Sequence, residues 1–147
     1  MIDTFTGSVA FDDGLHIKKS TPLSLIKHLP SVRSTSTAAG RDELSAGVHR
    51  LGHAEWGVGT IFVSGKLHQI WLQYLNAPNV NKNILEMQNE ITRKHAHDEI
   101  LMQLTFDKTP STSAPRHTPF VINYLWGSLS SVLDVRGVQA LIVIEYH

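Results

Sequence analysis

The residues best suited to chemistry are histidines that stand close to acidic residues. The chain has nine histidines, and His95 and His97 lie next to Asp98 and Glu99 in the run HAHDE. Zinc-binding helices place two ligands four residues apart so that both point the same way. His95 and His97 are two apart, about 200° around a helix, so they cannot both face one metal ion. A His95–Glu99 pair has the right spacing, but solvated or capping roles are favoured.

A second group is His49, His53 and Glu55. In one continuous strand these side chains would share a face, where histidine and carboxylate can carry out general acid–base catalysis. The polar alternation around them favours another interpretation, the wet side of a sheet. Gly52 is also able to bulge such a strand and break this register.

Sequence motifs for common catalytic and cofactor sites are missing. Ser64-Gly65-Lys66 lacks the spacing of a phosphate-binding loop, and Gly57-Val58-Gly59 precedes a strand instead of joining a strand to a helix. No GxSxG nucleophile motif occurs, and the absence of cysteine excludes thiolate chemistry and disulfides. We therefore expect no catalytic residues, no cofactor and no metal site, and a protein that is not an enzyme.

Composition narrows the remaining classes. The chain has 147 residues, which favours a single domain over 1–147. Lysine plus arginine and aspartate plus glutamate each number 13, so the chain lacks the basic field that draws proteins to nucleic acid. No apolar run is long enough to span a membrane, and the first residues lack the basic region of a signal peptide. With no cysteine, these features predict a cytoplasmic protein that does not bind a membrane, and they argue against nucleic acid as its partner.

The amino-terminal half predicts mainly strands. Alternating apolar residues on either side of Asp12-Asp13-Gly14 predict a hairpin over residues 8–18. Thr21 and Pro22 predict the cap and first residue of a short helix that ends at Pro30. Two or three antiparallel strands are expected over residues 47–74, with a tight turn at residues 64–66. The polar segments 30–40 and 109–119 are expected to be exposed loops.

The carboxyl-terminal half predicts one long helix and one hairpin. Asn79 or Asn81 is expected to cap a helix that runs to about Leu104. Its predicted buried face carries five apolar residues, namely Val80, Ile84, Met87, Ile91 and Met102. Arg93, Asn89 and Lys82 are expected in solvent, whereas Asp98 falls on the apolar side and needs a partner there unless the helix breaks near 95–97. Residues 120–147 predict two long strands joined by a turn at 134–137.

Together these elements predict an α+β fold in the order β-hairpin, short helix, β-meander, long helix and C-terminal β-hairpin. Short turns between the strands imply antiparallel pairing. A single antiparallel sheet packed against the long helix buries the apolar residues of both. The C-terminal strand is expected to lie at an edge, where it is available for pairing with a second copy.

Three stretches of the chain are TGSVAFDDGLHIKKSTPLSLI, GVGTIFVSGKLHQIWLQY and YLWGSLSSVLDVRGVQALIVIEY. Together they resemble small immunity proteins of polymorphic bacterial toxin systems, of the Rhs or contact-dependent-inhibition type. The resemblance implies a protein of bacterial competition that binds its cognate toxin domain in the cytoplasm and blocks the active site. It implies that acids such as Asp12, Asp13, Glu43 and Glu55 steer a basic partner and that Trp56 or Trp71 anchors it.

Two other functions stay open on the sequence. A small hydrolase would use histidine and acid groups from residues 49–55 or 95–99, and it requires at least two of them to converge in a pocket. A nucleic-acid or ligand-binding module would stack bases on Trp56 and Trp126. The zero formal charge of the chain argues against the second function.

Overall fold

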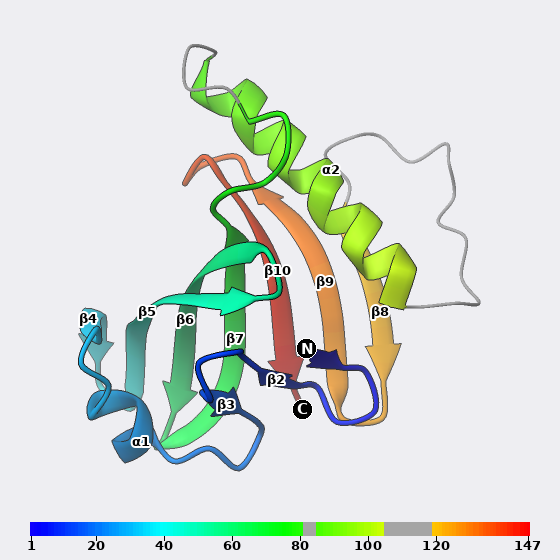
Figure 1. Cartoon of the computed structure of the whole chain (residues 1–147). Helices are drawn as coiled ribbons and strands as arrows, with labels where there is room; N and C mark the ends of the chain where they lie inside the picture. Colours follow the sequence, from blue (N-terminus) through cyan, green and yellow to red (C-terminus); the bar gives the residue numbers. More distant parts are fainter. Residues whose placement is uncertain (81–84, 105–118) are drawn as a thin grey trace.

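The fold is α+β, with two antiparallel sheets and one long helix (Figure 1). The computed structural model describes residues 1–80, 85–104 and 119–147. The fold class predicted from the sequence is confirmed, because the long helix packs on a large antiparallel sheet and a short helix precedes the meander. Within the described residues, no helix is long and apolar enough to cross a membrane.

The large sheet has seven strands. In spatial order they are β4 (Arg33–Ala38), β5 (Arg41–Leu51), β6 (Ala54–Val63), β7 (Lys66–Tyr74), β10 (Gln139–Tyr146), β9 (Gly127–Asp134) and β8 (Phe120–Tyr124). Alternate residues of the central strands form the core, because side chains along a strand point to opposite faces. Ile70, Leu72, Ile142 and Ile144 are fully buried on the inner face.

The amino-terminal residues form a small three-stranded sheet on the inner face of the large one (Figure 1). Its strands are β1 (Ile2–Asp3), β2 (Ser8–Ala10) and β3 (His16–Ile17). Pairing of Val9 with Ile17 confirms the predicted hairpin. The short helix α1 (Leu23–Lys27) starts one residue later than predicted. Pro22 is at its N-cap, and the hydroxyl of Thr21 accepts a hydrogen bond from the Lys18 amide instead of capping the helix.

The loop predicted for residues 30–40 is wrong over Arg33–Ala38, which forms the edge strand β4. This strand has no apolar alternation because it lies at the sheet edge, where backbone pairing with β5 is enough to hold it. The other predicted loop, 109–119, lies outside the described residues except for Pro119.

The C-terminal region forms three strands instead of the predicted two. Residues Leu125 and Trp126 turn the chain from β8 into β9, and no Gly-Asn or Asp-Gly signal marks this turn. Gly127 follows with a φ of 154°, and a Cβ there would lie 1.8 Å from the carbonyl oxygen of Glu145. The predicted turn at 134–137 is confirmed, with Asp134 accepting a hydrogen bond from the Arg136 amide.

The position of β10 corrects the expectation of an exposed C-terminal edge. β10 pairs with β7 on one side and β9 on the other, so it lies inside the large sheet. The edges of that sheet are β4 and β8. Pairing of two copies through the C-terminal strand is therefore incompatible with this fold.

The long helix α2 (Glu86–Leu104) packs on β9 and β10 with a face other than the predicted one. Its buried residues include Glu90, Arg93, Lys94, His97 and Leu101. The predicted apolar face is wrong. Met87 and Ile91 are half-buried and Met102 is exposed, Val80 precedes the helix, and Ile84 lies outside the described residues. The helix runs unbroken past residue 97, and Asp98 has the partner it was expected to need, the ammonium group of Lys94.

Candidate binding surface and the buried charges beneath helix α2

The charged face of α2 fills a fork in the large sheet. β7 and β10 pair only from Gln69–Glu145 to Leu72–Ile142, and beyond this point they diverge. Continued pairing would place Tyr74 opposite Ala140. The Leu75 amide bonds to the Glu55 carbonyl of β6, so the neighbouring N–H and C=O groups of Tyr74 face away from β6, toward the fork.

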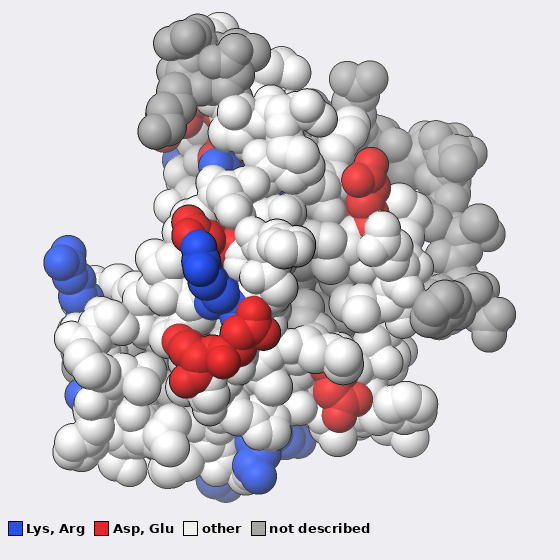
Figure 2. Space-filling view, in the orientation of Figure 1, with Lys and Arg blue, Asp and Glu red and all other residues white. Residues whose placement is uncertain are grey.

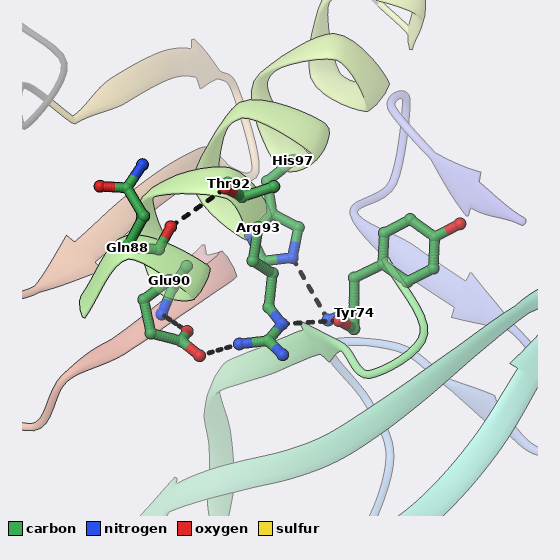
Figure 3. Close-up of polar contacts among 7 residues, drawn as sticks. Tyr74, Gln88, Glu90, Thr92, Arg93 and His97 are labelled. Atoms are coloured by element: carbon green, nitrogen blue, oxygen red, sulfur yellow. Dashed lines mark hydrogen bonds and ion pairs between the residues drawn. The ribbon is translucent and has the colours of Figure 1, made fainter. Parts of the chain in front are cut away.

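Three side chains of α2 take the hydrogen bonds that the missing strand pairs would have made (Figure 3). The Tyr74 amide donates to His97 Nε2 at 3.2 Å, and Arg93 Nε donates to the Tyr74 carbonyl at 2.7 Å. The Ala140 amide donates to Glu90 Oε2 at 2.7 Å. We call Glu90, Arg93 and His97 the α2 wedge. Buried backbone groups need such partners, which explains why the helix buries charges here.

The charges of the wedge are balanced inside the protein. Arg93 forms an ion pair with Glu90 on the same helix, and the neighbouring Lys94 is paired with Asp98 at 2.7 Å. Burial, reinforced by the cations of Arg93 and Lys94, lowers the pKa of His97 to about 3. His97 is therefore neutral at ordinary pH. Because its Nε2 accepts a hydrogen bond, its proton is on Nδ1.

The wedge does not form the metal site considered for the HAHDE run. His97 is fully buried against the sheet, whereas His95 is exposed and lines a small outward pocket with Glu99. The two histidines therefore face apart, as their spacing predicted. Within residues 1–80, 85–104 and 119–147, no group of three histidine, aspartate or glutamate side chains is placed to hold a metal ion.

A second charged region forms where the turn between β2 and β3 docks on the β5–β6 hairpin. The Asp12 amide donates to the Arg50 carbonyl at 2.9 Å, and the Asp12 carboxylate accepts from the Gly52 amide at 2.7 Å. These bonds fix the turn to the end of the hairpin. They bring two acidic residues close to Glu55, which is more than forty positions away in the sequence.

His49 also holds the turn between β2 and β3 in place. Its Nδ1 lies 2.6 Å from Asp13 Oδ2, and its Nε2 lies 3.1 Å from the carbonyl oxygen of Ala46. Both partner atoms, a carboxylate oxygen and a carbonyl oxygen, are hydrogen-bond acceptors. Ala46 lies at a bulge in β5, and its carbonyl also accepts a hydrogen bond from the Ser31 hydroxyl. The hydrogen bond from His49 holds the pKa of Asp13 below its usual range, so this carboxylate is ionised at neutral pH.

Asp12, Asp13 and Glu55 form what we call the acidic surface. Figure 2 shows acidic side chains gathered around a basic one on the face that carries β2, β3 and the β5–β6 hairpin. Arg50, directly opposite Glu55 in the hairpin, forms an ion pair with it at 3.3 Å, and its side chain is 71% exposed. The two aspartates stay exposed, so the surface carries more negative than positive groups.

A groove of about 620 Å³ borders the acidic surface. It lies between the β2–β3 turn, helix α1 and strand β5, and Asp13 stands in its wall. Much of its lining is aliphatic, from Leu15, Leu25, Leu29 and Val48. Leu25 and Val48 are 45% and 59% exposed, so apolar surface lies open beside an ionised carboxylate.

The structure separates the remaining residues predicted to contact a partner. Glu43 is at the other end of β5, on the order of 20 Å of strand away at ~3.3 Å per residue, and it pairs with Arg41. Trp71 does not line the groove. It lies on the sheet face opposite the buried Trp56, the same face as Glu55, and it covers Gly59, where a Cβ would be 1.9 Å from the indole. Trp56 is only 3% exposed and stacks on Tyr74 and His97. The expectation that Trp56 is a surface anchor is therefore wrong.

The residues of the two alternative sites, for a hydrolase and for base stacking, also lie elsewhere than the sequence predicts. His49, His53 and Glu55 do not share a strand face, because β5 ends at Leu51 and a turn with Gly52 at a φ of 60° separates them. The wet-face interpretation is also wrong for His49, which is buried. Trp126 stacks on Tyr124 and donates its indole N–H to the Thr4 carbonyl, so this ring holds the amino-terminal segment in place.

Comparison of the chain with known proteins gives no relative. No protein family, no curated protein and no solved structure matches it. The geometry of the acidic surface and its groove is therefore the basis for assigning a function.

Proposed function

We propose that this protein is an immunity protein that binds the catalytic domain of a cognate toxin in the cytoplasm and blocks its active site without turnover of its own. Its contact region is the acidic surface with the adjoining groove. The partner surface that fits it is basic, as expected of toxin sites that handle anionic substrates.

One observation carries this proposal: hydrogen bonds within the chain fix both aspartates of the acidic surface without a partner. Asp12 is tied to the main chain of the β5–β6 hairpin, and Asp13 is tied to His49. A preorganised surface loses little conformational entropy on binding, so more of its interaction energy appears as affinity. Negative charge on such a surface accelerates encounter with a basic partner and selects against acidic ones.

The apolar groove supplies surface for buried apolar contacts, which charged side chains alone do not provide. Exposed salt bridges each contribute little, typically under about 1 kcal/mol. Stable protein complexes instead depend on a few buried side chains surrounded by polar contacts. Leu25 and Val48 offer open apolar surface directly beside Asp13, which gives this arrangement of an apolar centre with a charged rim.

The proposal requires a toxin domain encoded next to this gene, and co-expression of the two chains tests it. We expect this protein to restore growth to cells that make the toxin domain, and the two chains to co-purify. Reversing the charge at Asp12 and Glu55 (Asp12→Lys with Glu55→Lys) should weaken binding at least about tenfold and flatten its dependence on salt.

A matched control uses the acid that the structure places elsewhere. Glu43→Lys makes the same change of charge per residue at the far end of β5, where Glu43 pairs with Arg41. It should leave affinity and salt dependence close to those of the wild type. If the neighbouring toxin neither binds nor is neutralised, the function is refuted. If it binds equally well to the double variant, the acidic surface is the wrong contact region.

A further inference from the structure

We propose that the groove bordering the acidic surface receives an arginine side chain of the partner, with its aliphatic stem on the apolar lining and its guanidinium group on Asp13. This inference rests on the proposed function and names the chemistry that the groove recognises. Its first basis is the lining, which combines four aliphatic residues with one exposed, ionised carboxylate, in a volume of about 620 Å³. That volume holds a complete long side chain.

Asp13 is oriented for such a contact. Oδ2 is held by His49 at 2.6 Å, and Oδ1 accepts from the Leu15 amide at 3.2 Å. These bonds fix the plane of the carboxylate, while its side chain stays 48% exposed. Each carboxylate oxygen has two acceptor positions, so both oxygens keep one for a guanidinium group.

The aliphatic lining favours a cation with a long stem over a small one. Arginine and lysine bury their methylene groups along apolar surface while the charged head reaches a polar partner. Val48 is 59% exposed and Leu25 is 45% exposed, so both offer open surface to such a stem. Asp12 and Glu55 lie beyond Asp13 on the acidic surface and add attraction for a positive group.

Charge complementarity selects this occupant over an apolar side chain. A leucine or phenylalanine in the groove would cover the exposed part of the Asp13 carboxylate without offering it a hydrogen-bond donor, which is unfavourable for a charged group. Arginine is favoured over lysine because its planar fork matches a carboxylate with both oxygens available, and because arginine is enriched among the residues that dominate protein interfaces.

The test is a titration of the full chain with N-acetyl-arginine methylamide, monitored by the NMR chemical shifts of the backbone amides. The titration is carried out at about pH 8, where an ordinary histidine is neutral. We expect the shifts to centre on Leu15, Val48 and His49. The norleucine analogue, which has a similar stem without charge, should bind about tenfold more weakly, the effect of one charge-assisted hydrogen bond. The lysine analogue should bind between the two.

Val48→Lys should abolish arginine binding, because it places a competing cation in the groove without altering the Asp13–His49 contact. Val121→Lys is the matched control, since Val121 is 50% exposed in β8, outside the groove. Equal binding of the arginine and norleucine analogues, or shifts centred outside the groove, would refute the inference.

The two proposals fail in different ways. If the toxin domain binds Val48→Lys as tightly as wild type but loses affinity for the Asp12→Lys, Glu55→Lys variant, the groove inference is wrong and the proposed function stands. If the toxin domain does not bind at all, the proposed function fails, whereas the arginine titration still reports on the groove.

Discussion

The α2 wedge and the acidic surface both bring carboxylates close to cations, yet their surroundings differ. Glu90, Arg93 and His97 are each at most 8% exposed and bond to backbone groups of β7 and β10. Asp12 and Asp13 also bond to fixed partners, but they remain exposed. The wedge completes the fold from within, whereas the surface leaves its charge available to another molecule.

This difference shows that a cluster of charged residues does not by itself mark a functional site. The wedge has the stronger local perturbation, since the pKa of His97 falls to about 3. Perturbed pKa values are enriched at functional sites, but structural networks shift them too. Here the hydrogen bonds of the wedge go mainly to backbone groups of β7 and β10, while His97 Nδ1 is buried without a hydrogen-bond partner among the described residues, so the shifted pKa reflects burial within the fold.

The largest expected effect comes from breaking the wedge. Arg93→Ala leaves Glu90 buried without its cation and the Tyr74 carbonyl without a donor, and it should lower the free energy of unfolding by about 3–5 kcal/mol. Urea denaturation measures this. Arg50→Ala is the matched control, because it removes the same side chain from an exposed ion pair with Glu55 and should cost at most about 1 kcal/mol. Equal losses of stability in the two variants would show that the α2 wedge supports the fold no more than the exposed Arg50–Glu55 pair does.

The next effect is a loss of stability in mild acid. The folded pKa of His97 is about 3, whereas an unfolded histidine titrates near 6.5. Below about pH 6.5 the unfolded chain therefore binds a proton that the folded chain does not, and stability falls by up to ~1.4 kcal/mol per pH unit. His97→Gln should remove most of this slope between about pH 6.5 and pH 4. An unchanged slope would show that another group is responsible.

A smaller effect is expected from removing the contact between His49 and Asp13, which holds Asp13 in place on the acidic surface. His49→Phe keeps a ring beside Phe11 but loses the bonds to Asp13 and Ala46, and it should cost about 1–3 kcal/mol. The pKa of Asp13 should rise toward its usual value, which NMR titration of the carboxyl group would report. His53→Phe, in the exposed turn, should change neither quantity.

The smallest effect is expected at the acidic surface itself. Glu55→Lys places like charges opposite each other in the hairpin, next to Arg50, and should change the free energy of unfolding by no more than about 1 kcal/mol. Denaturation of this variant beside Arg93→Ala tests the comparison directly. A loss similar to that of Arg93→Ala would mean that the acidic surface also supports the fold.

Local pattern was enough to predict the fold class and several strand pairs. Alternation around the Asp12–Gly14 turn gave the first hairpin, and the turn at 134–137 gave the last. β4 was missed because its polar sequence RSTSTA reads as a loop, although pairing with β5 holds it. β8 was joined to β9 in the prediction because Leu125 and Trp126 turn the chain without the usual turn residues.

The orientation of α2 could not be predicted, because its cause lies outside the helix. Helical periodicity assigns apolar residues to the buried face, but the divided sheet requires hydrogen-bonding side chains there. Only the paths of β7 and β10 reveal this need. The choice of Trp56 as an anchor failed for a related reason, since its burial depends on stacking with Tyr74 and His97.

The candidate surface was predicted in part. Negative charge alone marks Asp12, Asp13 and Glu55 in the sequence, and the structure brings them together through contacts between the β2–β3 turn and the β5–β6 hairpin. Glu43 has the same charge but lies apart. The groove and the role of His49 had no sequence signal, because both depend on segments that meet only in the folded chain.

The fork between β7 and β10 implies that a competing structure has to be prevented. By register, Tyr74 and Ala140 would be partners if the two strands continued to pair. In a chain without α2, β7 and β10 are therefore free to pair along this stretch. The helix therefore acts as a spacer that holds β7 and β10 apart beyond Leu72 and Ile142. Slow amide exchange at Tyr74 and Ala140 is accordingly a reporter of helix docking, because the hydrogen bonds of both amides end on α2.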